Sequence, residues 1–300
     1  MAIGRDLLAV IGAGGIGHAI ARRLGSGKAV LLADNNDETL ASVGESLTAA
    51  GHRVLTCRVD VASAESVRGL AQYAASLGDV THVAHTAGLS PAQASAQAIL
   101  TVDLLGVALV LQEFGEVIAP CGAGVVIASM AGHLVPPISA EQEQALAHNP
   151  PGELLQLDFV SRITEPAFAY PIAKQANHIR VRAASAKWGR RGARINSISP
   201  GIISTPMGQH ELDSAVGDGM RAMIAKSGTG RIGTADDIAA AAAFLLGPDA
   251  SFITGTDLVV DGGVIAAVRS GESWPRLDPS IRLATPGAHI SRRRAQPGAK

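Results

Sequence analysis

The chain has 300 residues, of which 47% are hydrophobic and 17% are charged. This composition is typical of a globular protein, and the length suits a single α/β domain with one wide sheet. The 25 basic and 26 acidic side chains nearly cancel, so the net charge provides no general attraction to nucleic acid or to an anionic membrane.

The two cysteines, Cys57 and Cys121, are too few for a disulfide framework, and neither has a cysteine or histidine at metal-ligand spacing. We therefore expect no metal and a reducing, cytoplasmic location. The N-terminal run RDLLAVIGAGGIGHAIA has the charge and hydropathy of a secretory signal, but Asp6 interrupts its basic region. The longest other apolar run, IAAAAAFLLG, is too short to span a bilayer, so no membrane segment is expected.

Apolar runs with the character of β-strands alternate with runs of helical periodicity along the chain. The expected strands occupy residues 7–12, 28–34, 52–60, 80–88, 123–132, 193–199 and 256–263. The expected helices occupy residues 15–25, 37–51, 63–78, about 93–116 and 170–188, with a last helix beginning near Thr234.

This alternation predicts parallel strands joined by right-handed crossovers, and the strands are apolar on both faces, as a sheet between two helical layers requires. The expected fold class is α/β, a Rossmann-type doubly wound parallel sheet of about seven strands with helices on both faces. Ligands bind such a sheet at the carboxyl ends of its strands.

We expect residues 1–268 to form a single dinucleotide-binding and catalytic domain. Residues 133–167 break the alternation and contain five prolines, which indicates an insertion on the substrate side that carries one or two short helices. Residues 269–300 are rich in Arg, Pro, Ser and Gly. We interpret them as a flexible, solvated tail rather than as a nucleic-acid-binding segment.

The first candidate site is VIGAGGIGHAI, in which Gly12, Gly14 and Gly17 form G-x-G-x-x-G between a strand and a helix. The first glycine permits a tight turn, the second lets a pyrophosphate approach the backbone, and the third lets helix and strand pack closely. Asp34 closes the second strand, where its carboxylate would bind an adenosine ribose and repel a 2′-phosphate. This favours NAD(H) over NADP(H); the alternative is that Asp34 only caps the next turn.

The second candidate is Tyr170 with Lys174, which share one face of a helix because they are four residues apart. The ordinary tyrosine pKa is about 10, and an ammonium one turn away lowers it toward the range of a general base. The alternative is a half-buried ring beside a flexible lysine. Ser129 ends the fifth strand, where its hydroxyl could bind a developing alkoxide or could simply bond its own backbone.

Together these motifs resemble those of the short-chain dehydrogenase/reductase family, over about Leu7 to Gly263. GAGGIG resembles the family's phosphate loop, RVDV its adenine-contacting pair and HTAG its turn after the fourth strand. SMAG resembles the segment with the catalytic serine, YPIAK the Y-x-x-x-K motif and SPGIISTPM the P-G-x-x-x-T segment. The sequence from Gly230 to Gly263 resembles the family's usual ending.

The resemblance implies that Tyr170 is the general acid/base, that Lys174 holds the nicotinamide ribose and lowers the tyrosine pKa, and that Ser129 orients the substrate oxygen. His85 and Thr86 replace paired asparagines of the family and are expected to contact the cofactor or to pack beneath it. The resemblance also implies the following cofactor-binding residues: Gly12, Gly14, Gly15, Ile16, Gly17, Asp34, Asp60, Val61, Ala87, Gly88, Tyr170, Lys174, Pro200, Gly201, Ile203 and Thr205.

Three features depart from the family pattern. The glycine loop is one residue short, and the insertion separates Ser129 from Tyr170. Asp103 stands in the place of an asparagine that continues a proton relay, so it is a candidate catalytic residue whose charge near Lys174 would alter the relay or the pH optimum.

We expect an NAD(H)-dependent oxidoreductase that interconverts a secondary alcohol and a ketone by hydride transfer. The insertion is expected to cover the cleft and to favour a hydrophobic substrate, because it contains Leu134, Val135, Pro136, Ile138, Leu154, Leu155, Leu157 and Phe159. The resemblance further implies a homodimer or a homotetramer.

One alternative is a non-catalytic dinucleotide-binding sensor or partner subunit of the same fold. Another is a sugar-nucleotide epimerase or dehydratase, against which the VVDGG ending argues. The nine histidines form no cluster in the sequence, and His133 is interpreted as a loop residue near the cleft without a role.

Overall fold

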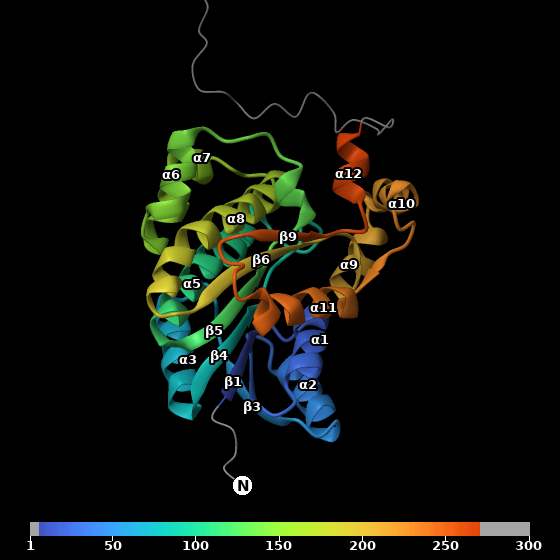
Figure 1. Cartoon of the computed structure of the whole chain (residues 1–300). Helices are drawn as coiled ribbons and strands as arrows, with labels where there is room; N and C mark the ends of the chain where they lie inside the picture. The colour runs from blue at the N-terminus through green and yellow to red at the C-terminus, as the bar shows by residue number, and fades with distance from the viewer. Residues whose placement is uncertain (1–5, 271–300) are drawn as a thin grey trace, which may run out of the picture.

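The computed structural model describes residues 6–270, and a seven-stranded parallel sheet with helices on both faces lies at its centre (Figure 1). The strand order is β3-β2-β1-β4-β5-β6-β9, so the order reverses between β1 and β4 and places a crevice at their carboxyl ends. The predicted fold class is confirmed. The strands are β1 Asp6–Ile11, β2 Ala29–Asp34, β3 Arg53–Arg58, β4 Asp79–His85, β5 Ile118–Ile127, β6 Arg194–Pro200 and β9 Asp257–Val260.

Alternate residues of the central strand β1 belong to two cores, one on each face of the sheet. Leu7 and Ile11 pack beneath the layer of α3, α5 and α8, whereas Leu8 and Val10 pack beneath the layer of α1, α2 and α11. All four side chains are fully buried, which explains why the strands are apolar on both faces. The helices are α1 Gly15–Leu24, α2 Asp37–Ala49, α3 Ala64–Leu77, α4 Ala96–Ile99, α5 Val107–Val117, α8 Pro166–Arg190 and α11 Ala235–Leu246.

The helix expected over about 93–116 is α4, a π-helical segment η1 (Leu100–Gly106) and α5, without a break. π-helical turns are rare and are frequent at functional sites; this one contains Asp103. The segment Ala96–Val117 is long and apolar enough to cross a membrane, contrary to the expectation from apolar runs, but 72% of its most apolar window is buried. It is a core helix of the layer that packs on the sheet.

Residues 133–167 form α6 (Ala140–His148), the short turn η3 (Pro151–Gln156) and α7 (Asp158–Ser161), as expected of an insertion with short helices. These elements pack against α4, η1 and α8 (Figure 1). A third apolar cluster at this contact buries Leu146, Leu154 and Val160 completely.

The expectation that the insertion covers the substrate cleft is wrong for most of its length. Among residues 133–167, only Leu134 lines the cleft at the carboxyl edge of the sheet. The other apolar side chains are present because short helices need an apolar face to bury, and here they bury it against α8.

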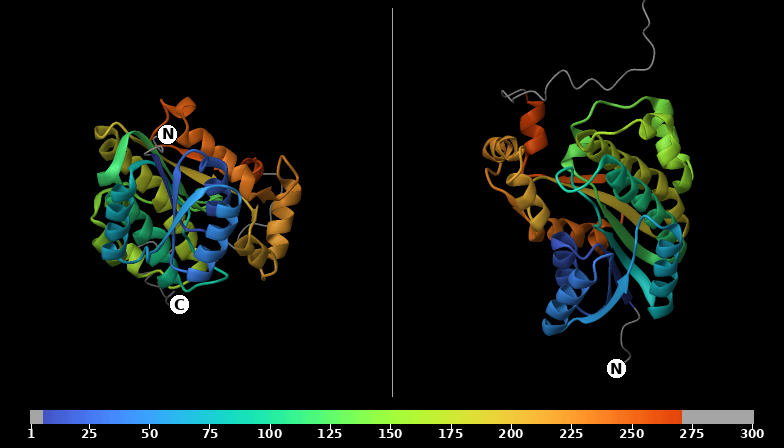
Figure 2. Two further views of the ribbon diagram at one scale, coloured as in Figure 1. Left: turned by 90° about the horizontal axis from the view of Figure 1, so that it is seen from below. Right: turned by 180° about the vertical axis from the view of Figure 1, so that it is seen from behind.

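A second group of short elements lies between β6 and β9 and after β9. β7 (Ile203–Ser204) pairs with β8 (Gly233–Thr234) in a separate two-stranded sheet. Figures 1 and 2 show that α9, α10 and α12 gather on one side of the carboxyl edge, opposite α6 and α7. These helices are α9 Pro206–Leu212, α10 Gly217–Lys226 and α12 Val264–Arg269. Nearly all of the tail predicted over 269–300, from residue 271 on, lies outside the described residues, as do residues 1–5.

Candidate active site

A cleft of about 840 Å³ opens at the carboxyl ends of the central strands. Every residue that the sequence assigned to cofactor binding lines this cleft, from Gly12 in the glycine loop to Thr205 after β7. Ser129, Tyr170 and Lys174 line it as well. Asp103 does not reach the cleft, because it is fully buried in contact with Lys174.

The three glycines of the loop have different structural requirements. Gly12 has a φ of +100°, and a Cβ there would lie 2.8 Å from Ala87 Cα, so only glycine fits. A Cβ at Gly17 would collide with the carbonyl oxygen of Gly12. At Gly14, which precedes α1, a Cβ would meet no atom within 4 Å. The open space beside Gly14 and the unpaired amides at the start of α1 suit a phosphate group.

Asp34 at the end of β2 and Thr86 directly after β4 hold this loop in place from the two strands that flank β1. Asp34 Oδ2 accepts a hydrogen bond from the Ala13 amide at 2.7 Å, and Asp34 Oδ1 accepts one from the Asn36 amide at 3.0 Å. The Thr86 hydroxyl donates to the Gly12 carbonyl at 2.5 Å. Asp34 therefore stabilises the local turns, as one of its two alternative roles predicts, and it also lines the cleft.

His85 packs beneath the cleft, which is one of the two positions expected for it; the other was in contact with the cofactor. It is fully buried, and burial lowers the pKa of its imidazole to about 3, with the Lys174 charge acting in the same direction. The ring is therefore neutral.

Ser129 lies two residues beyond β5 and caps the short 3₁₀ helix η2 (Met130–His133). Its hydroxyl accepts a hydrogen bond from the Ala131 amide at 3.1 Å and is hydrogen-bonded to Tyr170. The hydroxyl thus makes the local backbone bond that its position predicts and also faces the phenol.

Tyr170 and Lys174 lie on α8, with Lys174 Nζ 5.4 Å from the centre of the Tyr170 ring. Lys174 Nζ also lies 3.2 Å from Asp103 Oδ2 in an ion pair, and it donates to the Ile127 carbonyl at 3.4 Å. Asp103 Oδ1 accepts a hydrogen bond from the Leu89 amide at 2.8 Å. The π-helical segment η1 thus presents a carboxylate to the lysine, on the side away from the cleft.

Burial raises the pKa of the Tyr170 phenol above its ordinary value. Lys174 and Ser129 lower this pKa, whereas the carboxylates of Asp103 and Glu211 raise it further, and the net direction is upward. The lysine acts in the direction that the sequence predicts, but in the protein alone it does not outweigh burial.

Burial alone would lower the pKa of the Lys174 ammonium, but Asp103 and Tyr170 outweigh it and the net pKa is raised. Burial also raises the pKa of the Asp103 carboxyl, against the opposing effects of Lys174 and the Leu89 amide. Lys174 is therefore a charged group at neutral pH, fixed beside the phenol.

Comparisons with known proteins give the family of this chain. A family model described as short chain dehydrogenase matches residues 7–140, and one described as enoyl-(acyl carrier protein) reductase matches residues 138–265. The chain is 41% identical over 264 residues to the short-chain dehydrogenase/reductase bsc3 of Alternaria brassicicola, covering 87% of this chain and 96% of that relative. The chain belongs to the short-chain dehydrogenase/reductase family.

Two further members of this short-chain family are informative. A D-threitol dehydrogenase of Mycolicibacterium smegmatis is 31% identical over 271 residues, which cover 87% of this chain and 92% of the relative. A short chain dehydrogenase of Burkholderia cenocepacia, crystallised in complex with NADP, is 25% identical and has a TM-score of 0.68 over 87% of this chain and 97% of that one. Family and fold together identify an oxidoreductase that binds a nicotinamide dinucleotide.

The family motifs do not specify which residues form the outer wall of the cleft, and the sequence did not predict these residues. Glu211 on α9 lines this wall as a half-buried carboxylate. Every methionine other than Met1 also lines the cleft: Met130, Met207, Met220 and Met223. A methionine or a glutamate on an amphipathic helix carries no sequence signal of a cleft, so only the packing of α9 and α10 could reveal them.

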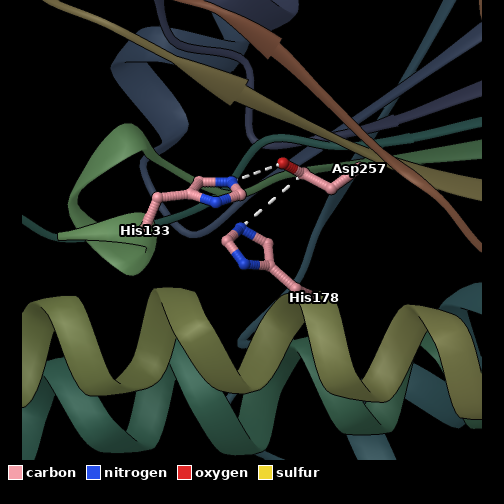
Figure 3. A group of neighbouring side chains, drawn as sticks. All are labelled: His133, His178 and Asp257. Carbon is pink, nitrogen blue, oxygen red and sulfur yellow. Dashed lines mark hydrogen bonds and ion pairs between the residues drawn. The ribbon is translucent and has the colours of Figure 1, made fainter. Parts of the chain in front are cut away.

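The structure brings together two histidines that lie far apart in the sequence, and it gives His133 a hydrogen-bond partner. The His133 and His178 rings lie 4.4 Å apart between centroids, and His133 Nε2 donates to Asp257 Oδ2 at 2.7 Å (Figure 3). These three residues come from distant parts of the chain, so their spacing in the sequence could not reveal the cluster.

Proposed function

We propose that the protein is an NAD(H)-dependent oxidoreductase that interconverts a secondary alcohol and a ketone. The observation that carries this proposal is the convergence of Ser129, Tyr170 and Lys174 in the cleft that contains the glycine loop. A protein that only binds a dinucleotide needs the loop but has no use for a phenol, a serine and a charged lysine side by side.

The residues of the cleft fit a bound nicotinamide dinucleotide. The space beside Gly14 and the start of α1 would hold the pyrophosphate, Asp34 the adenosine ribose, and Asp60 and Val61 the adenine. Ala87, Gly88, Ile203 and Thr205 would hold the nicotinamide end, together with Lys174 at the ribose. When bound, the nicotinamide supplies the acceptor or the donor of the hydride.

Tyr170 removes the hydroxyl proton of the alcohol in one direction and returns it to the ketone oxygen in the other. Lys174 favours the phenolate by its charge, because it lowers the tyrosine pKa that burial raises. The Ser129 hydroxyl donates to the substrate oxygen as negative charge develops on it. Asp103 acts through Lys174, as a positioning residue that keeps the lysine charged.

The preference for NAD(H) over NADP(H) rests on Asp34. Its carboxylate lies at the carboxyl end of β2 and lines the cleft, where a 2′-phosphate would bring a second negative charge close to it. The NADP complex of the Burkholderia cenocepacia relative makes NADP(H) the alternative.

The proposed substrate is a neutral, predominantly apolar alcohol or ketone. The methionines and Leu134 give the outer cleft a flexible apolar lining. Glu211 places a negative charge in the same wall, which disfavours substrates with a carboxylate or a phosphate near the reacting carbon. It can also accept a hydrogen bond from a second hydroxyl, in keeping with the polyol substrate in the name of the D-threitol dehydrogenase.

We also propose a cytoplasmic homo-oligomer, either a homodimer or a homotetramer. β9 is an edge strand of the sheet, and three large apolar side chains are exposed on it and nearby, Val259, Phe244 and Phe252. An apolar edge of this kind supports association of copies through β9. Sedimentation of the purified protein beside a Phe252→Asp variant tests this assignment, which fails if both sediment as monomers.

The deciding experiment is an absorbance screen with NAD⁺ over secondary alcohols, run on the natural protein and on Tyr170→Phe. We expect kcat to fall by about 10²–10⁴-fold in the variant, since that is the usual contribution of general acid–base catalysis, with NADH binding retained by fluorescence titration. Tyr73→Phe, at the only other tyrosine, is the matched control. Undiminished turnover in Tyr170→Phe would refute the mechanism, and NADH binding without any turnover would favour a sensor.

A further inference from the structure

The cluster of His133, His178 and Asp257 joins three elements beside the reaction centre. His133 ends η2, the turn that Ser129 caps, and His178 lies on α8 one turn beyond Lys174. Asp257 begins β9. Figure 3 shows both imidazole rings directed toward the single carboxylate. None of the three residues lines the cleft, so the reaction described above leaves them without a role.

The donor atoms of the cluster lie close together. His133 Nε2 is 2.7 Å from Asp257 Oδ2, His178 Nε2 is 3.7 Å from Asp257 Oδ1, and one ligand atom from each residue can be chosen so that all lie within 4.8 Å of one another. The side chains are 23%, 14% and 11% exposed for His133, His178 and Asp257. They are thus largely shielded from water but still reachable by an ion.

Two serines of β6 surround this group. The Ser197 hydroxyl donates to Asp257 Oδ1 at 2.6 Å, which fixes the orientation of the carboxylate. Ser199 Oγ lies 2.9 Å from His178 Nε2. The Ser197 bond is of the kind that orients ligands in metal sites, although the same bond also forms in purely structural polar networks. The Ser199 bond is made by the His178 nitrogen that faces Asp257, so a metal would replace it.

We propose that His133, His178 and Asp257 bind one Zn²⁺ ion. Two imidazole nitrogens and one carboxylate oxygen form a donor set that zinc favours, with a fourth position left for water. Zinc–ligand bonds of about 2.0–2.2 Å place tetrahedral donors about 3.3 Å apart. Around Asp257 Oδ2, the His133 pair at 2.7 Å would open by about half an ångström, and donor atoms that now lie up to 4.8 Å apart would close by up to about 1.5 Å, through rotation of the side chains.

A zinc ion at this position connects the turn after Ser129 to α8 and β9. That turn already lies directly on α8, since a Cβ at Gly132 would come within 2.7 Å of the Gln175 amide nitrogen. The ion would hold Ser129 and Tyr170 in a fixed relationship, so its role is structural and it takes no part in the proton or hydride steps.

The test uses the full chain without an affinity tag, because a histidine tag would bind zinc itself. After EDTA treatment and desalting, Zn²⁺ is titrated against a chromogenic chelator, and Co²⁺ is added separately to record visible absorption. We expect one Zn²⁺ per chain, a tetrahedral Co²⁺ spectrum and a higher melting temperature with Zn²⁺. His133→Gln and His178→Ala should each weaken Zn²⁺ binding more than tenfold.

His148→Gln, which alters an exposed histidine of α6 outside the cluster, is the matched control and should bind as the natural protein does. Circular dichroism tests whether each variant is folded. If His178→Ala does not fold, the result for His133→Gln alone decides whether the proposal holds. Zn²⁺ binding that His133→Gln leaves unchanged overturns the proposal. So does a natural protein that binds no Zn²⁺ at micromolar concentration, in which case the three residues form a hydrogen-bonded network only.

Discussion

The carboxylate of Asp103 lies 3.2 Å from the ammonium of Lys174, and both side chains are buried. A Cβ at Gly88 would lie 3.2 Å from Lys174 Nζ and 3.4 Å from both Asp103 oxygens. The ion pair is thus enclosed beneath the turn after β4, and glycine at position 88 leaves room for it. Through this pair, the π-helical segment η1 influences the charge next to Tyr170.

Replacing Asp103 by asparagine should move the whole pH–rate profile of alcohol oxidation to lower pH. The Asp103 charge raises the pKa of Tyr170 and of Lys174, so removing it lowers both pKa values. The acid limb, which requires the phenolate, and the alkaline limb, which requires the ammonium, should therefore shift in the same direction. Measured kcat/KM between pH 5 and pH 11, with Asp158→Asn on the exposed α7 as control, checks this; two unmoved limbs contradict it.

Two alanine substitutions in the glycine loop should have opposite consequences. At Gly17 a methyl group collides with the Gly12 carbonyl oxygen, so Gly17→Ala should destabilise the fold by about 1–3 kcal/mol. At Gly14 the methyl group meets open cleft. The free energy of unfolding of Gly14→Ala should therefore stay within about 0.5 kcal/mol of that of the natural protein, but the variant should bind NADH at least tenfold more weakly. Denaturant unfolding and fluorescence titration separate the two effects. Equal destabilisation by both would show that the loop geometry has been misread.

The sheet and the loop could be predicted from the sequence because both depend on local pattern. Leu7 and Leu8 are adjacent and enter opposite cores, and this gives the apolar character that identifies a parallel strand. Gly12, Gly14 and Gly17 are separated by fixed short distances, since one turn of backbone must meet one phosphate.

The outer cleft and the histidine cluster could not be predicted in the same way. Glu211 reaches the cleft because α9 follows β7 directly at the carboxyl edge of the sheet. β7 and β8 have only two residues each, which is too short for a strand pattern that the sequence could show. His133, His178 and Asp257 meet only through the packing of η2, α8 and β9. The insertion was wrongly expected to cover the cleft because an apolar sequence pattern is the same whether the side chains line a cleft or fill a core.

Leu154→Ala should destabilise the protein without changing its choice of substrate. Leu154 is fully buried between the insertion and the helices beneath it, and truncation of such a leucine costs about 2–5 kcal/mol. Leu155→Ala, at the partly exposed neighbouring position, should cost less than half of that. Leu134→Ala should behave oppositely and alter the ranking of alcohols, because Leu134 lines the cleft. A changed ranking in Leu154→Ala would restore the insertion as a substrate cover.

Asp34→Asn should raise the affinity for NADPH relative to NADH by at least about tenfold, which corresponds to about 1.4 kcal/mol. The substitution removes the charge that opposes a 2′-phosphate. It keeps one side-chain oxygen as acceptor for the Ala13 or the Asn36 amide. Fluorescence titration with both cofactors measures the ratio of the two affinities. Asp37→Asn, at the exposed first residue of α2, is the control. An unchanged ratio would remove Asp34 from the selection of cofactor.

Glu211→Gln should relax the exclusion of anionic substrates and shift only one limb of the pH profile. The Glu211 carboxylate raises the pKa of Tyr170, whereas the groups that raise the pKa of Lys174 are Asp103 and Tyr170. The acid limb of alcohol oxidation should therefore move to lower pH while the alkaline limb stays, unlike in Asp103→Asn. In a matched pair of substrates, one a neutral alcohol and one bearing a carboxylate, kcat/KM should rise for the anionic member and change little for the neutral one. Glu141→Gln, at the exposed start of α6, controls for the loss of a negative charge elsewhere. If Glu211→Gln leaves the preference between the two substrates unaltered, Glu211 does not face the bound substrate.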